Sequence, residues 1–131
     1  HDKPSTVCHE LSHLKGFMRE DEANFVAYLA CRSSDNPEFR YSGSILAYIY
    51  SGNALYSQNL EAFRQVREKL CDQAVADLLH HNAYWDTYRG TVSEVSDKVN
   101  DVYLKVNSQE DGTKSYGRMV DLLLAWNREQ P

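Results

Sequence analysis

Apolar residues recur at helical spacing along most of the chain. In residues 19–33, Ala23, Val26, Ala27 and Ala30 lie three or four positions apart, which is the spacing of one helix face. Similar patterns predict helices over residues 5–15, 42–56, 58–70, 91–106 and 115–126, and around Val75, Leu78, Leu79 and Trp85. No apolar run alternates with a period of two, as a strand requires. We therefore expect an all-α fold, a compact bundle of six or seven helices forming a single domain over residues 1–131.

Residues that favour helix ends divide these segments. Ser5 is expected to be the N-cap of the first helix, and Gly16 the residue just beyond its C-terminus. Residues 35–38 (Asp-Asn-Pro-Glu) predict a turn, and residues 107–114 a loop. Thr91 and Ser115 would cap the last two helices.

Composition narrows the functional classes. The net charge is −5, which disfavours nucleic-acid binding because a basic face is needed against phosphate. The chain has an odd number of cysteines, and they are widely spaced: Cys8, Cys31 and Cys71. We therefore expect buried free thiols rather than a disulfide framework. No apolar stretch is long enough to cross a membrane. Because the chain begins with His1 instead of Met, we expect it to be a soluble fragment of a longer protein.

Residues 9–13, with the sequence HELSH, match the metallopeptidase motif H-E-x-x-H. His9 and His13 are four residues apart on a predicted helix, so both imidazole rings can reach one ion. Zinc binds neutral imidazole nitrogen readily. Glu10 would lie beside the metal, where it could accept a proton from an activated water molecule. The motif therefore predicts a zinc site with Glu10 as the catalytic carboxylate.

A catalytic zinc ion usually has three protein ligands. No third histidine follows closely, and the acidic residues Glu20, Asp21 and Glu22 come just after Gly16. We favour Glu20, because Asn24 lies one turn later on the same face and could hydrogen-bond the far nitrogen of a zinc-bound histidine. Glu22 is the alternative and Asp21 a more distant one. Acidic residues in a first helical turn also complement the helix dipole, so most of these three are expected to have only that role.

Residues 9–30 (HELSHLKGFMREDEANFVAYLA) resemble the zinc-binding block of a bacterial membrane-anchored family catalogued as domain of unknown function 3810. They are similar, more loosely, to the gluzincin peptidases. The E-x-x-A-N run of residues 20–24 resembles an element whose first glutamate binds zinc and whose last residue supports a histidine, which implies these roles for Glu20 and Asn24. The gap between His13 and Glu20 is shorter than in gluzincins. Residues 100–125 resemble the same family.

This resemblance implies the helical half of a zincin-like metallopeptidase, anchored to a membrane in its full-length form and acting on a peptide or protein substrate. Such hydrolysis needs a donor that stabilises the developing oxyanion. Candidates for this role are Tyr116, Arg118 and His80. The alternative functions are a non-catalytic zinc-binding module for sensing or scaffolding, and a helical interaction domain without metal. Glu10 favours the enzyme, because folding around zinc needs only the ligands.

Overall fold

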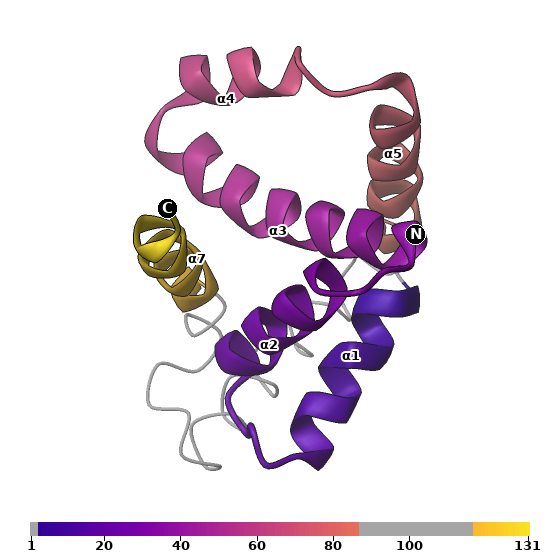
Figure 1. Cartoon of the computed structure of the whole chain (residues 1–131). Coiled ribbons are helices and arrows are strands. Elements are labelled where there is room, and N and C mark those ends of the chain that lie inside the picture. Colours follow the sequence, from indigo (N-terminus) through magenta and orange to yellow (C-terminus); the bar gives the residue numbers. More distant parts are fainter. Residues whose placement is uncertain (1–2, 87–116) are drawn as a thin grey trace. The chain divides into compact units, whose positions relative to one another are not determined.

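The computed structural model describes residues 3–86 and 117–131, and every regular element in these residues is a helix (Figure 1). The prediction of an all-α fold is therefore confirmed. The helices, in chain order, are α1 (Lys3–Leu14), α2 (Glu20–Arg32), α3 (Pro37–Gln58), α4 (Leu60–Arg67), α5 (Asp72–Asp86) and α7 (Arg118–Glu129). The helix expected over residues 91–106, its Thr91 cap, the loop at 107–114 and Ser115 lie outside the described residues.

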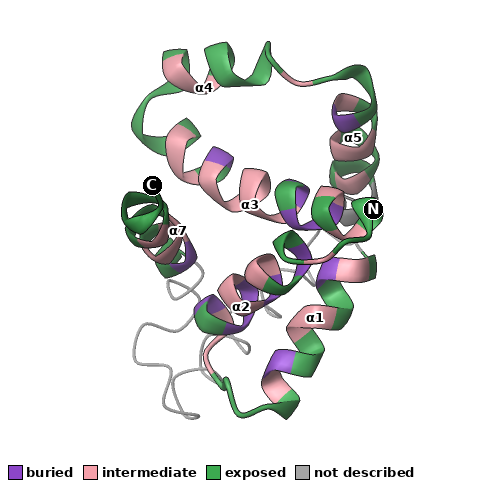
Figure 2. Cartoon of the chain, viewed as in Figure 1, coloured by how far each residue is buried: buried purple, intermediate pink, exposed green. Residues whose placement is uncertain are grey.

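The chain divides into two compact units. The first contains α1, α2, α3 and α7, and the second begins at Arg64 and contains α5. Within the first unit, α2 packs against α1, α3 and α7, and α3 also contacts α1 and α7. Buried residues are densest on α2 (Figure 2). This helix is thus the centre of the first unit, which carries the H-E-x-x-H motif.

Helix α1 starts earlier than Ser5, so the predicted N-cap was wrong. The helix begins at Lys3, and Ser5 lies buried in its first turn. The backbone N–H of Ser5 donates to the side-chain oxygen of Ser42 on α3 at 3.0 Å. A serine from a distant helix therefore satisfies one of the N–H groups in the first turn of α1.

Gly16 ends α1 as predicted. Its φ angle is +103°, a backbone conformation that residues with a β-carbon rarely adopt. The N–H of Gly16 donates to the carbonyl of His13, and the N–H of Phe17 donates to the carbonyl of Ser12. These two bonds form a Schellman motif, which turns the chain sharply towards α2.

The packing of α2 against α3 depends on small residues. Ala23, Ala27 and Cys31 on α2 are completely buried, whereas Ala30, expected on the same face, is exposed. A β-carbon added to Gly43 of α3 would lie 2.7 Å from the β-carbon of Cys31. Glycine at position 43 therefore allows the two helices to approach this closely.

Helix α3 begins within the stretch that was predicted to be a turn. Asn36 is the N-cap, and its side chain accepts a hydrogen bond of 2.8 Å from the backbone N–H of Glu38. Pro37 is the first helical residue, where its fixed φ suits the helix and its missing N–H costs nothing. The turn prediction was therefore wrong for Pro37 and Glu38, because asparagine followed by proline also starts a helix.

Helix α7 is held against α2 by Trp126. The Trp126 ring meets the Tyr28 ring edge-on with centroids 6.0 Å apart, and the Arg32 guanidinium lies 4.9 Å from the centre of the Trp126 ring. Met119, near the start of α7, is completely buried. The apolar face predicted for this helix is therefore the face that packs.

The cysteines differ in burial. Cys31 is buried, Cys8 is half-buried and Cys71 is exposed, so the prediction of buried thiols was wrong for Cys71. The sulfur atoms of Cys8 and Cys31 lie 3.8 Å apart between α1 and α2. Burial, together with the neighbouring Cys8, raises the pKa of Cys31 to about 12. Cys31 is therefore an inert packing thiol.

A helix crosses a bilayer only if it is long and apolar enough. Within residues 3–86 and 117–131, no helix combines the length and the apolar character that crossing a bilayer requires.

Candidate metal centre

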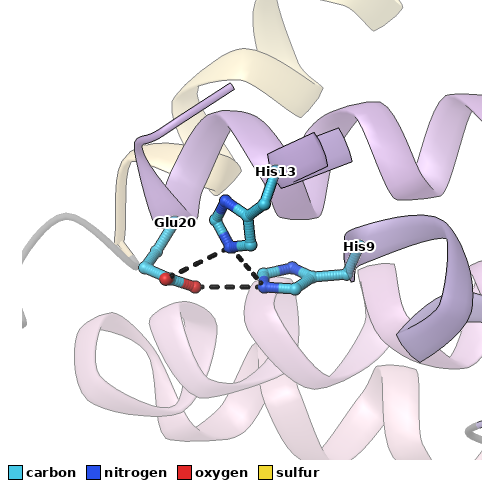
Figure 3. Close-up of side chains that lie close together, drawn as sticks. All are labelled: His9, His13 and Glu20. Carbon is cyan, nitrogen blue, oxygen red and sulfur yellow. Dashed lines mark hydrogen bonds and ion pairs between the residues drawn. The ribbon is translucent and has the colours of Figure 1, made fainter. Parts of the chain in front are cut away.

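Three side chains from α1 and α2 converge on one point (Figure 3). Nε2 of His9 lies 3.0 Å from Nε2 of His13. The two carboxylate oxygens of Glu20 lie 3.2 Å from Nε2 of His9 and 3.3 Å from Nε2 of His13. The histidines are four residues apart on α1, and the turn at Gly16 brings the first residue of α2 back to them. Among the residues that the structure describes, these are the histidine, cysteine or acidic side chains that lie close enough together to hold a metal ion.

The turn at Gly16 also orients His13. The Schellman motif places the carbonyl oxygen of Phe17 2.7 Å from Nδ1 of His13. A carbonyl oxygen can only accept, so Nδ1 must carry the proton. In neutral His13 the lone pair is therefore on Nε2, the nitrogen that faces Glu20.

His9 is oriented in the same way by a side chain of α2. Nδ1 of His9 lies 2.8 Å from Oδ1 of Asn24, which is buried. This oxygen accepts, so the neutral His9 ring also carries its proton on Nδ1 and has its lone pair on Nε2. Asn24 occupies the position that the sequence predicted for a residue supporting a zinc-bound histidine.

These two hydrogen bonds direct the lone pairs of both Nε2 atoms to the point where the Glu20 carboxylate lies. With both rings neutral, two bare imidazole nitrogens lie 3.0 Å apart, and each lies within 3.3 Å of one of the two oxygens of the Glu20 carboxylate. Such an arrangement is unfavourable unless a proton or a metal cation lies between the atoms. The three side chains remain 18 to 25% exposed, so the point is accessible from solvent.

The charges around this point favour protonation of His9. A hydrogen bond to Glu20 raises the pKa of His9 above its usual 6.5, and the charge of Glu20, the Asn24 contact and the charge of Glu10 add to the shift. Burial of His9 opposes it. The same hydrogen bond to His9 lowers the pKa of Glu20 below its usual 4.5. The site thus favours positive charge between its three side chains.

The other two acidic residues of the first turn of α2 point elsewhere. Asp21 is buried and forms an ion pair with Arg19, whose Nε lies 3.2 Å and Nη2 3.4 Å from its two oxygens. Glu22 is exposed and is not part of the converging group. Of the three carboxylates weighed from the sequence, Glu20 alone is brought to the histidines.

Glu10 lies beside the converging group but is not part of it. Its carboxylate is exposed on α1, directly after His9. Its negative charge acts on His9, where it contributes to the raised pKa of that ring.

The three candidate oxyanion donors lie in different parts of the chain. Arg118 is the exposed first residue of α7 in the first unit. His80 is exposed on α5 in the second unit. Tyr116 lies outside the described residues. The assignment of an oxyanion donor thus stays a prediction.

Two contributors were not anticipated from the sequence. The first is the Phe17 carbonyl, for which Gly16 was the available signal, since a Schellman motif determines where the next carbonyl points. The second is Tyr50 of α3, whose hydroxyl lies 3.1 Å from Nδ2 of Asn24. Tyr50 is 26 residues from Asn24, and nothing local to either residue indicates the contact.

Comparison with known proteins identifies a family but no function. No curated protein and no solved structure matches the chain significantly. One family model, described as "Protein of unknown function (DUF3810)", matches residues 1–124, which include the whole candidate metal centre. The predicted resemblance of residues 9–30 and 100–125 to this family is therefore confirmed as far as family membership goes. The chain belongs to the DUF3810 family.

Proposed function

We propose that this protein is a zinc-dependent metallopeptidase in which His9, His13 and Glu20 hold the metal. The observation that carries the proposal is the convergence of the two Nε2 atoms and the Glu20 carboxylate, with the proton of each ring directed to Nδ1 by an oxygen acceptor. An imidazole so oriented is ready to bind a metal through its other nitrogen.

The separations between the donor atoms of the three side chains support zinc. Bonds of about 2.0 to 2.1 Å in a tetrahedral site place neighbouring donor atoms about 3.3 to 3.4 Å apart. The two Nε2 atoms lie 3.0 Å apart, and one oxygen of Glu20 lies 3.2 Å from Nε2 of His9 while the other lies 3.3 Å from Nε2 of His13, so each of these separations is close to this value. Two imidazoles and one carboxylate also form a ligand set of catalytic zinc sites, whereas calcium and magnesium prefer oxygen ligands alone.

Each residue has a role in the proposed reaction. When bound, zinc would supply Lewis-acid activation of water and of the scissile carbonyl group. Glu10, exposed next to His9, would accept the proton of the attacking water and deliver it to the leaving amine. Asn24 and the Phe17 carbonyl would hold the two imidazoles in place while this happens.

The substitution Glu10→Gln tests the catalytic part of the proposal. It replaces the carboxylate by an amide of nearly the same shape, so zinc content and stability should be unchanged. Hydrolysis of an unfolded protein substrate should fall by about 100-fold or more, which is the usual contribution of a general base. Glu38→Gln, which alters an exposed carboxylate in the first turn of α3, is the matched control and should retain full activity.

The same measurements separate the alternatives. A wild-type chain that binds one zinc ion but hydrolyses no peptide, even when extended to full length, would be a zinc-binding module for sensing or scaffolding. A chain that binds no zinc after reconstitution would be a helical domain without metal. Equal activity of Glu10→Gln and wild type would also refute the proposal.

We also propose that the full-length protein works at a membrane. The resemblance of residues 9–30 and 100–125 to a membrane-anchored family supports this. Membrane fractionation of cells that produce the full-length protein tests it, and recovery of all the protein in the soluble fraction would contradict it.

A further inference from the structure

A chain of hydrogen bonds connects the metal centre to a helix that provides no ligand. Nδ1 of His9 on α1 lies 2.8 Å from Oδ1 of Asn24 on α2, and Nδ2 of Asn24 donates to the hydroxyl of Tyr50 on α3 at 3.1 Å. Asn24 is 5% exposed. The amide oxygen of Asn24 therefore contacts His9 on α1, and the amide nitrogen contacts Tyr50 on α3.

The orientation of the Asn24 amide decides which nitrogen of His9 can bind a metal. With Oδ1 towards the ring, Nδ1 carries the proton and the lone pair lies on Nε2, which faces His13 and Glu20. A rotation of the amide by half a turn would bring Nδ2 to the ring instead. Since an amide N–H can only donate, the neutral ring would then carry its proton on Nε2, where it blocks the metal.

We propose that Tyr50 is a positioning residue for the metal centre. Its hydroxyl oxygen accepts from Nδ2 of Asn24, which holds Oδ1 towards His9 and thereby keeps Nε2 of His9 free of a proton. This inference rests on the proposed zinc site and deepens it. Tyr50 acts through Asn24 and makes no contact with the metal itself.

The position of Tyr50 explains how α3 contributes to the site. A buried side-chain amide without a partner at one end would be free to turn, and water is largely excluded from a group that is 5% exposed. Helix α3 packs against both α1 and α2, so its tyrosine reaches the one end of Asn24 that His9 does not occupy. The three packed helices together thus select the tautomer of a single histidine.

The substitution Tyr50→Phe tests the proposal by removing only the hydroxyl. We expect it to weaken zinc binding about tenfold, the lower end of what losing an outer partner of a metal ligand costs. Affinity is measured by competition with a chromophoric chelator. Tyr48→Phe is the matched control, because Tyr48 is also half-buried on α3 and lies two residues away. It should bind zinc as the wild type does.

Two further measurements separate positioning from general support of the fold. The double variant Tyr50→Phe/Asn24→Ala should bind zinc no more weakly than Asn24→Ala alone, since Tyr50 acts only through Asn24. In the metal-free protein at high pH, nitrogen NMR of the imidazole should show His9 protonated at Nδ1 in the wild type. The Tyr50→Phe variant should shift His9 towards protonation at Nε2.

The outcomes are distinct. Wild-type affinity and an unchanged His9 tautomer in Tyr50→Phe would overturn the inference, as would a further loss of affinity in the double variant. If the wild-type chain binds no zinc, the proposed function fails. The tautomer measurement, which needs no metal, still decides whether Tyr50 orients Asn24.

Discussion

Nδ1 of His13 lies 2.7 Å from the backbone carbonyl oxygen of Phe17. The residue after the glycine that ends α1 therefore orients one of the proposed metal ligands. The Schellman motif at Gly16 thus reverses the chain towards Glu20 and also directs the proton of His13 away from the proposed metal position. The local geometry of one turn and the chemistry of the site are coupled through this bond.

Gly16→Ala should damage both stability and zinc binding. The φ angle of +103° is strained for alanine, so we expect a loss of about 1 to 2 kcal/mol in the free energy of unfolding. A shifted turn would also move the Phe17 carbonyl away from His13, and zinc affinity should fall about tenfold. Urea unfolding and chelator competition measure the two effects.

Gly117→Ala is the control for that experiment. Gly117 has a φ angle of −68°, and as at Gly16, an added β-carbon would meet no atom within 4 Å. Its replacement should leave stability and zinc affinity nearly unchanged. If Gly16→Ala proved as stable as Gly117→Ala, the role of the positive φ angle would be refuted.

Glu20→Ala should weaken zinc binding far more than Glu22→Ala. Both residues lie in the first turn of α2, so both substitutions remove a similar interaction with the helix dipole. Only Glu20 reaches the histidines, and its loss should reduce affinity by more than about 100-fold, the upper end of the cost of losing an outer partner. Equal losses, or a larger loss at Glu22, would show that the wrong carboxylate has been assigned.

Zinc affinity should fall as the pH is lowered, with the decline starting above pH 6.5. Protons compete with the metal for Nε2 of His9, and a hydrogen bond to Glu20 raises the pKa of His9 above 6.5. The proton therefore binds more tightly than to a free histidine, and it begins to displace zinc at a higher pH. Chelator competition between about pH 5 and about pH 9 measures the decline.

The cause of that shift is tested in the metal-free protein. Proton NMR should give a titration midpoint for His9 above 6.5 in the wild type. Glu20→Gln removes the charge that stabilises the protonated ring, so the midpoint should move down. A midpoint that does not change would mean that Glu20 does not control His9.

Gly43→Ala should destabilise the first unit, although alanine favours helices more than glycine does. The added β-carbon would lie 2.7 Å from the β-carbon of Cys31, so α2 and α3 would have to move apart. Overpacking of this kind costs about 1 to 3 kcal/mol. Thermal or urea unfolding measures the change.

Gly52→Ala on the same helix provides the comparison. There, an added β-carbon would lie 3.4 Å from a ring carbon of Phe63, which is an ordinary contact. Alanine should stabilise the helix by up to about 1 kcal/mol at this position. A loss of stability as large as that of Gly43→Ala would mean that the close approach to Cys31 is not what requires glycine.

The sequence by itself determined the helical class and part of the candidate metal centre. Apolar spacing located helices near their observed positions, and Gly16 marked the end of α1. The four-residue separation of His9 and His13 placed both rings on one helix face. These features could be predicted because they depend on backbone periodicity and on bonds between residues a few positions apart.

Only the tertiary structure decided which partners these residues meet. Glu20 and Glu22 are the same residue type in the same helical turn. The path of the chain through Phe17 brings Glu20, and not Glu22, to the two histidines. Ser42 satisfies the N–H of Ser5, and Tyr50 reaches Asn24, across 37 and 26 residues of chain. Such contacts form where separate helices pack against one another, and spacing along a single helix contains no information about which distant helix will lie beside it.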